Sequence, residues 1–256
     1  MTVVGVLHPG EMGAAVGSAL RGCGHTVLWA SAGRSVATTE RAQQAGLEDA
    51  GDVRELCRRC DVLFSICPPH AATDVARLTS GFRGIYVDAN AIAPKTARAV
   101  GALHERFVDG GIVGPPPLQP GTTRLYLSGG EADPIVALFA GTNVDARAIS
   151  DEPGAASAIK AAYAGWTKGS AALLLTVREL ARAEGVEQAL LAEWRLSIPE
   201  LEERLAGAER SARRKGWRWI GEMEEIAAGM RANDLPPGFH EAAAAVFRRR
   251  SNEEPT

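Results

Sequence analysis

The sequence has few of the features that mark a membrane, secreted or nucleic-acid-binding protein. It contains only four cysteines in 256 residues, and their distribution does not resemble a disulfide framework. No apolar run is long enough to span a bilayer, and no basic stretch followed by an apolar core begins the chain. The formal net charge is −3 and the basic residues are dispersed. We therefore expect a cytoplasmic globular protein with no membrane or nucleic-acid partner.

Two of the cysteines form a C-x-x-C pattern, Cys57 and Cys60. Such a pair is typical of a metal site only when a second pair, or histidines at ligand spacing, accompany it. The chain has neither. We interpret the pair as two cysteines near the end of a helix, and we expect no metal.

The chain divides into two halves of different character. Up to about residue 150, short apolar runs alternate with helical patterns, which is typical of a doubly wound, mostly parallel sheet with helices on both faces. From Pro153 onward no strand pattern remains. Residues 154–184 carry helical periodicity without a proline, which predicts about 45 Å of helix. We expect an α/β Rossmann-like domain at 1–150, an all-α domain at 151–250 joined by the long helix, and a disordered tail at 251–256.

The patterns also place the individual elements. Strands are predicted at 3–7, 26–30, 62–66, 84–88, 106–109, 124–128 and 144–149. Helices are predicted at 11–22, 36–45, 53–59, 71–79, 94–105 and 134–140, and after the long helix at 187–195, 199–206, 217–232 and 237–249. Residues 110–123 are rich in glycine and proline, which indicates a loop at the edge of the sheet.

A glycine-rich turn follows the first predicted strand and opens a helix of small residues. Gly10 lets the backbone approach a pyrophosphate, and Gly13 lets the helix pack closely on the strand. The helix N-terminus adds N–H groups and a positive dipole end. His8 stands where such a turn usually has its first glycine, and a glycine turn without a phosphate remains an alternative. The predicted cofactor contacts in this turn are His8, Pro9, Gly10, Glu11 and Met12.

The turn after the second predicted strand indicates which nucleotide binds. NAD sites usually place an acidic residue there to accept from the ribose 2′-hydroxyl, and this turn has none. It has Arg34 flanked by Ser31 and Ser35, and a guanidinium with two hydroxyls suits a 2′-phosphate. The alternative is a polar turn whose serine only caps the next helix. We expect the cofactor to be NADP(H).

Five segments in order resemble the β-hydroxyacid dehydrogenase group of the 6-phosphogluconate dehydrogenase-like superfamily, over nearly the whole chain. The segments are Gly10-Glu11-Met12-Gly13, Ile66-Cys67-Pro68-Pro69, the turn from Asp88 to Pro94 with Asn90 in place of a serine, Asp109-Gly110-Gly111-Ile112-Val113-Gly114-Pro115, and the helix start from Gly154 to Lys160. The resemblance implies cofactor contacts at Cys67, Pro68, Pro69 and Asn90, and substrate contacts at Gly111, Val113 and Gly114.

Several positions depart from the family pattern. Val113 stands where the family has a substrate-holding serine, and Ala164 stands where it has an asparagine four residues after the lysine. The Lys-Asp pair of the family's C-terminal half corresponds to Glu224-Glu225. These changes remove polar groups that would hold a small hydroxy acid. We interpret them as a retained chemistry with a larger or less polar substrate.

Hydride transfer to a carbonyl needs a proton donor for the developing alkoxide. Lys160 is the best candidate, because the resemblance places it at the catalytic position and small residues around it leave room for a ligand. Tyr163 and Thr167 follow at i+3 and i+7, on the same helix face. Tyr163 could orient the substrate or the lysine, or it could fill the core. Lys168 follows Thr167, lies beside this face of the helix, and is expected at the surface.

Trp217 and Trp219 flank an arginine in the C-terminal half. They could form an aromatic wall of the substrate site, delivered across a dimer, or they could start a helix whose aromatic side chains fill the core. A homodimer is expected because the long helix exposes an apolar flank that the chain alone cannot bury.

The sequence therefore predicts an NADP(H)-dependent oxidoreductase that transfers a hydride between the nicotinamide and a carbonyl or hydroxyl carbon of a small organic substrate. Two alternatives remain. An NADPH-dependent imine reductase has a similar architecture, but such enzymes generally lack a lysine at the position of Lys160. A non-catalytic dinucleotide-binding protein is the other, and the loss of the family's serine and asparagine lends it weight.

Overall fold

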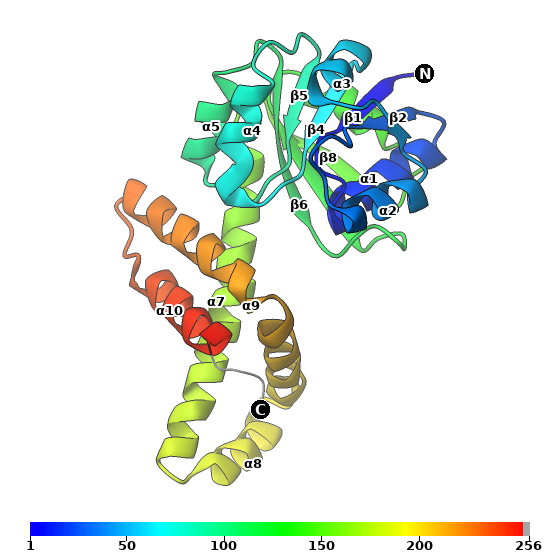
Figure 1. Cartoon of the computed structure of the whole chain (residues 1–256). Helices are drawn as coiled ribbons and strands as arrows, with labels where there is room; N and C mark the ends of the chain where they lie inside the picture. Colours follow the sequence, from blue (N-terminus) through cyan, green and yellow to red (C-terminus); the bar gives the residue numbers. More distant parts are fainter. Residues whose placement is uncertain (253–256) are drawn as a thin grey trace. The chain divides into compact units, whose positions relative to one another are not determined.

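The computed structural model describes residues 1–252 and divides the chain into two compact units (Figure 1). The first unit, Met1–Lys160, contains the whole sheet, and the described part of the second unit, Ala161–Thr256, consists of helices and the short segments that connect them. The predicted fold class, a doubly wound α/β domain followed by an all-α region, is confirmed. The two units are described one at a time.

An eight-stranded sheet forms the centre of the first unit, in the order β3-β2-β1-β4-β5-β6-β7-β8. Neighbouring strands are parallel except for β6 and β7, which are antiparallel. The order reverses between β1 and β4, and ligands of such sheets bind at the carboxyl ends of the strands beside this switch point. The strands are β1 Val3–Val6, β2 Thr26–Trp29, β3 Glu48–Asp49, β4 Val62–Ser65, β5 Ile85–Asp88, β6 Phe107–Val113, β7 Thr123–Ser128 and β8 Val144–Ser150.

Helices cover both faces of the sheet, and each face has its own apolar cluster. One cluster joins the sheet to α1 (Glu11–Gly22), α2 (Val36–Gln44) and α6 (Ala132–Leu138). The other joins it to α3 (Val53–Arg59), α4 (Ala72–Leu78) and α5 (Pro94–Gly101), with a short 3₁₀ helix at Pro69–Ala71 before α4. The central strands are buried on both faces, which explains why their sequences are continuous apolar runs.

Two predictions for this unit were wrong. The short strand β3 was missed, because it consists of two exposed acidic residues with no apolar pattern. The segment 110–123 was predicted to be a loop at the sheet edge, but β6 continues to Val113 and two further strands lie beyond it. Gly110 and Gly111 pair with Leu127 and Tyr126 of β7 and so belong to the strand. A helix packs on Gly111, where a Cβ would overlap the carbonyl oxygen of Ala156. Only residues 114–122 connect β6 to β7.

The second unit contains most of α7 (Ala155–Ala183) together with α8 (Glu187–Ser197), α9 (Glu200–Ala232) and α10 (Gly238–Asn252). Its core gathers apolar side chains of these helices around Leu175, Met223 and Phe247. The prediction of two helices at 199–206 and 217–232 was wrong, because α9 runs unbroken through the buried Gly216. Ser251, placed in the predicted disordered tail, lies in α10, and its hydroxyl donates to the Phe247 carbonyl at 2.9 Å. Residues 253–256 of that tail lie outside the described residues.

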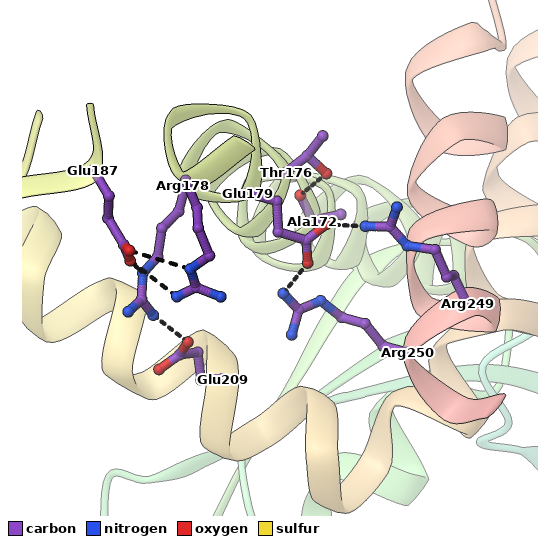
Figure 2. A network of polar contacts seen from close by, with 9 residues as sticks. Ala172, Thr176, Arg178, Glu179, Glu187, Glu209, Arg249 and Arg250 are labelled. Atoms are coloured by element: carbon purple, nitrogen blue, oxygen red, sulfur yellow. Dashed lines mark hydrogen bonds and ion pairs between the residues drawn. The ribbon is translucent and has the colours of Figure 1, made fainter. Parts of the chain in front are cut away.

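A network of ion pairs joins α7 to the other helices of the second unit (Figure 2). Its charged groups come from positions far apart in the sequence, so the network holds α8, α9 and α10 against α7. The pairs are Arg178–Glu187 at 2.7 Å, Arg182–Glu187 at 2.9 Å, Arg178–Glu209, Glu179–Arg249 and Glu179–Arg250.

We expect Glu187 to make the stability of the protein depend on pH. Hydrogen bonds from Arg182 and Arg178 lower its pKa from 4.5 to about 2. Because the folded-state pKa is the lower one, the stabilisation is present above about pH 4.5 and is lost as the pH falls toward about 2. Glu187→Gln should flatten this part of the stability curve, measured by urea unfolding. Glu193→Gln, on the same helix but outside the network, should leave the curve unchanged, and identical curves for wild type and Glu187→Gln would contradict the expectation.

Candidate functional site

The turn between β1 and α1 lies at the carboxyl end of β1, beside the switch point of the sheet. Gly13 is required there, because a Cβ would overlap the His8 carbonyl oxygen. Gly10 is the N-cap of α1; no side chain caps the helix, and no atom lies within 4 Å of the position that a Cβ of Gly10 would take. The first N–H groups of a helix have no acceptors within the helix. The turn therefore combines backbone donors with open space, which suits an anion.

Two arginines brace this turn. Arg34 donates to the Leu7 carbonyl at 3.1 Å, and Arg41 of α2 donates to the Pro9 carbonyl at 3.5 Å. Burial, and secondarily the charge of Arg34, lower the pKa of His8 to about 4, so His8 is neutral at physiological pH. Sequence reasoning selected Arg34 and missed Arg41. No pattern in the local sequence marks Arg41 as a partner of the Pro9 carbonyl, because the two residues are 32 positions apart.

The two serines beside Arg34 have local partners. The Ser35 side chain caps α2 by accepting from the Thr38 N–H at 3.3 Å, which was the structural alternative for this residue. Ser31 donates to the Gly51 carbonyl at 3.4 Å. Ser35 is exposed and Ser31 is half-buried. Helix capping by Ser35 is therefore established, whereas nothing in these contacts distinguishes NADP from NAD.

Asn90 ties together the carboxyl ends of β4 and β5. Its amide nitrogen donates to the Ser65 hydroxyl at 3.0 Å and to Asp88 at 2.9 Å, and its amide oxygen accepts from the Cys67 N–H at 2.6 Å. Asn90 is only 2% exposed. Both of its donors are used within the protein, so its contribution is to fix the turn that begins at Cys67 and continues through Pro68.

Burial disfavours the ionised forms of several groups at this edge of the sheet. Burial raises the pKa of the half-buried Cys67 to about 11, so it remains a thiol. Burial also raises the pKa of Asp88 to about 7. With His8 neutral, the positive charges nearest to the glycine turn are those of Arg34 and Arg41.

Lys160, the last residue of the first unit, is half-buried and lies on α7 where that helix packs on β6. A Cβ at Gly111 would lie 3.1 Å from the Lys160 Cβ. β6 pairs with β5 only as far as Asp109↔Asp88, so Gly111 lies beyond the carboxyl end of β5. Lys160 and the glycine turn are therefore at the same edge of one sheet.

The other two residues predicted to contact substrate at the end of β6, Val113 and Gly114, are each constrained by the local structure. Val113 is only 3% exposed. Gly114 has a φ of +117°, and a Cβ there would overlap the Thr122 carbonyl oxygen, so glycine is required to start the connection to β7. From the sequence alone, a residue kept for the backbone or the core cannot be told apart from a residue that contacts the substrate.

Two further candidates lie in the second unit, on α7. Tyr163 is half exposed, and the Thr167 hydroxyl donates to the Tyr163 carbonyl at 2.9 Å. Thr167 thus uses its donor on its own helix. Lys168 was expected at the surface, and this was wrong: it is largely buried, pairs with Glu222, and lies 5.6 Å from the centre of the Trp219 ring. The side of α7 that carries Lys168 is covered by α9, which the local sequence of α7 does not reveal.

The two predicted aromatic residues of α9 have different environments. Trp219 packs edge-on against Phe247, with ring centres 5.0 Å apart, as the core-packing alternative predicted. Trp217 is 64% exposed. The pair is therefore not a single aromatic surface, since one ring fills the helical core and the other faces outward.

Within the described residues there is neither a cluster of metal-binding side chains nor a helix that could cross a membrane. No group of three or more His, Cys, Asp or Glu side chains within residues 1–252 is placed to hold a metal ion. No helix in that range is long and apolar enough to cross a membrane. Cys57 and Cys60 are free thiols at the end of α3, and burial raises their pKa to about 11 and about 12.

Comparison with known sequences gives two matches. Residues 181–250 match a family model described as a domain of unknown function, DUF1932. An uncharacterized 28.5 kDa protein from Methanothermus fervidus, encoded in the 7S RNA 5′ region, is 31% identical over 162 residues, which is 62% of this chain and 63% of that protein. The chain thus spans a little under two thirds of the length of this curated relative.

Solved structures match over almost the full length. A conserved protein of unknown function, described as structurally similar to 3-hydroxyacid dehydrogenases, is 30% identical, with 96% of each chain covered and a TM-score of 0.75. A Mycobacterium tuberculosis 3-hydroxyisobutyrate dehydrogenase is 17% identical (99% and 94% covered, TM-score 0.76), and an Aspergillus terreus reductive aminase in complex with NADPH is 18% identical (99% and 94% covered, TM-score 0.62).

The last two structures share the fold, whereas the first also shares sequence over the whole chain. That structure is described as similar to 3-hydroxyacid dehydrogenases, and its match covers both the sheet and the helical part of this chain. The chain belongs to the β-hydroxyacid dehydrogenase-like NAD(P)-binding superfamily, as a divergent member.

Proposed function

We propose that this protein is an NADP(H)-dependent oxidoreductase that transfers a hydride between the nicotinamide and a carbonyl or hydroxyl carbon of a small organic substrate. The observation that carries the proposal is the position of Lys160. It lies on α7 against Gly111, at the same carboxyl edge of the sheet as the open, uncapped start of α1. A proton donor and an anion-binding turn at one sheet edge are what such a reaction requires.

The residues at the turn fit a dinucleotide. Open space at Gly10 beside the α1 N-terminus suits the pyrophosphate, and the neutral His8 adds a ring nitrogen, Nδ1, that is buried with no hydrogen-bond partner among the described residues. Arg34 and Arg41 bring positive charge suited to a 2′-phosphate. The wall of the dinucleotide site beside this turn would be formed by Cys67, Pro68, Pro69 and Asn90. Its margins would be formed by Glu11, Met12, Ser31 and Ser35. When bound, the nicotinamide supplies or accepts the hydride.

In this proposal Lys160 handles the proton. In the reducing direction its ammonium group protonates the substrate oxygen as the carbonyl carbon becomes tetrahedral, and in the oxidising direction its amine removes the hydroxyl proton. Gly111 keeps the strand close to α7 beside it. Val113 replaces the hydroxyl that the family uses to hold a hydroxy acid, which favours a larger or less polar substrate.

The second candidate function is imine reduction. The fold similarity to a reductive aminase supports it, but Lys160 favours a carbonyl substrate because an ammonium group is well matched to a developing alkoxide. Tyr163, one helical turn after Lys160, is the alternative proton donor.

We also propose that the protein is a homodimer that pairs through α7. Within the second unit, Tyr163, Trp166, Leu173 and Leu180 are exposed by 48%, 69%, 57% and 61%. With the half-buried Ser170 and Val177 between them, these positions repeat every 3.5 residues, which is the spacing of a left-handed coiled coil. We call these six residues the α7 stripe. A second copy of the same stripe is a matching occupant, because a two-fold interface joins identical surfaces.

Replacing Arg34 tests the cofactor preference. Arg34→Ala should weaken NADPH binding by about ten- to hundredfold, the usual effect of losing a hydrogen bond to a charged group. NADH binding should weaken less, and only through loss of the brace on the Leu7 carbonyl. Titration calorimetry of both cofactors separates the two effects. Arg54→Ala on α3 is the control, and equal losses for NADPH and NADH would refute the 2′-phosphate assignment.

Replacing Lys160 tests the chemistry. Lys160→Met should leave the dissociation constant of NADPH nearly unchanged and lower kcat by about 10² to 10⁴, the range for loss of a general acid. The rate of NADPH oxidation is measured with a panel of 3-oxo acids, aldehydes and cyclic imines. Lys95→Met on α5 is the control. Ketone reduction at the parent rate would eliminate Lys160 as the acid, and retention of imine reduction alone would favour the second candidate function.

The α7 stripe provides a direct test of assembly. Light scattering at micromolar protein should give about twice the mass of one chain for the wild type. The double variant Leu173→Glu, Leu180→Glu should give a folded monomer, because charges would lie in an apolar seam. Leu196→Glu changes a leucine of α8 that is 82% exposed and lies outside the stripe, and this variant should remain dimeric. A wild-type protein that scatters as a monomer would overturn the homodimer.

A further inference from the structure

Side chains from the sheet close the amino end of α7. Asp109 of β6 accepts from the Gly154 N–H at 3.0 Å, from the Ser157 N–H at 2.8 Å and from the Ser157 hydroxyl at 2.6 Å. Ser128 of β7 accepts from the Ala156 N–H at 3.0 Å and donates to Asp109 at 3.1 Å. Asp109, Ser128 and Ser157 are 0%, 0% and 1% exposed. We call these three side chains the α7 cap.

The remaining donors of the first turn are satisfied by the backbone. The Ala155 N–H donates to the Glu152 carbonyl at 3.4 Å, and the Ala158 N–H makes a helical bond to the Gly154 carbonyl at 2.9 Å. All of the N–H groups that a helix start normally leaves unpaired are therefore used here. α1 differs, since no side chain caps it and open space adjoins its start. An anion is thus expected at α1, and the role of Asp109 must lie in the structure of α7 itself.

The α7 cap determines how α7 lies on the sheet. Ser157 precedes Lys160 by three residues, which is less than one helical turn. Its N–H and its hydroxyl both donate to Asp109. These two bonds fix the rotation of α7 about its own axis and its position along that axis relative to β6. Two residues further along β6, a Cβ at Gly111 would overlap the Ala156 carbonyl oxygen and lie 3.1 Å from the Lys160 Cβ. The strand that carries Asp109 is therefore also the strand against which Lys160 lies.

We propose that Asp109 is a positioning residue for Lys160: through Ser157 and Ser128 it holds the first turns of α7 on β6, so that the lysine amine is delivered to a fixed point at the carboxyl edge of the sheet. This inference rests on the proposed role of Lys160 as proton donor. A displacement of about 1 Å of a catalytic group costs about a hundredfold in rate. Asp109 thus affects the rate without touching the substrate.

The lysine content of the chain makes a direct readout feasible. The sequence has four lysines, Lys95, Lys160, Lys168 and Lys215. Reductive ¹³C-methylation followed by NMR therefore gives four dimethyl-lysine signals, each assigned with a Lys→Arg variant. In Asp109→Ala the Lys160 signal should shift and broaden while the Lys95 and Lys215 signals stay in place. Unmethylated Asp109→Ala should show kcat at least about tenfold lower, with the NADPH dissociation constant within about twofold of wild type.

A matched control separates positioning from helix capping in general. Asp52 caps α3 in the same unit by accepting from the Glu55 N–H at 2.8 Å. Asp52→Ala removes a capping aspartate of the same unit, and it should leave the Lys160 signal and kcat unchanged. If Asp109→Ala fails to fold, the experiment uses Ser157→Ala instead. This variant loses the hydroxyl bond to Asp109 and keeps the bond from the Ser157 N–H. It should shift the NMR signal of Lys160 by a smaller amount.

The outcomes distinguish the two proposals. A folded Asp109→Ala or Ser157→Ala protein whose Lys160 signal and kcat match wild type would overturn the positioning role, whatever its melting temperature. Failure of the catalytic proposal would give a different result. Lys160→Met would then reduce substrates at the parent rate, while Asp109→Ala would still shift the NMR signal of Lys160. A shift of the signal with a lower kcat in the Asp109 variant, together with an inactive Lys160→Met, supports both.

Discussion

The packing of α7 on β6 is the contact on which the candidate site depends. It needs a strand without side chains at Gly111, where the Ala156 carbonyl comes close, and a buried acceptor at Asp109, where the helix begins. Neither is sufficient alone. A side chain at Gly111 would push the helix away, and a helix start without Asp109 would bury unpaired N–H groups, each costing on the order of 1–3 kcal/mol. Together they bring Lys160 to the edge of the sheet where α1 begins.

Burial neutralises two of the ionisable groups at that edge of the sheet. His8 and Cys67 are uncharged at neutral pH, since burial disfavours their ionised forms. Positive charge near the glycine turn comes from the guanidinium groups of Arg34 and Arg41, which donate to carbonyls of that turn. This positive charge therefore lies beside the backbone donors at the start of α1, which no side chain caps.

Local sequence was a good guide wherever a local rule was sufficient. The apolar runs predicted the central strands, because strands buried on both faces have no polar side. The Gly10-x-x-Gly13 turn was found because only glycine tolerates the contact with the His8 carbonyl. Prediction failed where a distant element is decisive: α9 buries Lys168, and pairing with β7 makes two apparent loop glycines part of a strand. Arg41 was missed because an arginine on an exposed helix has no local mark of its contact with Pro9.

By itself the sequence determined the class of fold, the place of the glycine turn, the long helix and the lysine near its start. Each follows from periodicity, from backbone sterics or from a motif within a few residues of itself. Only the tertiary structure decided what Asp109 does, because its partners Gly154 and Ser157 are 45 and 48 residues away. The same holds for the start of α1, which no side chain caps, and for the start of α7, whose N–H groups are all paired. Hydrogen bonds between distant segments leave no periodic trace in a chain, and they form only after the sheet and the helix are in contact.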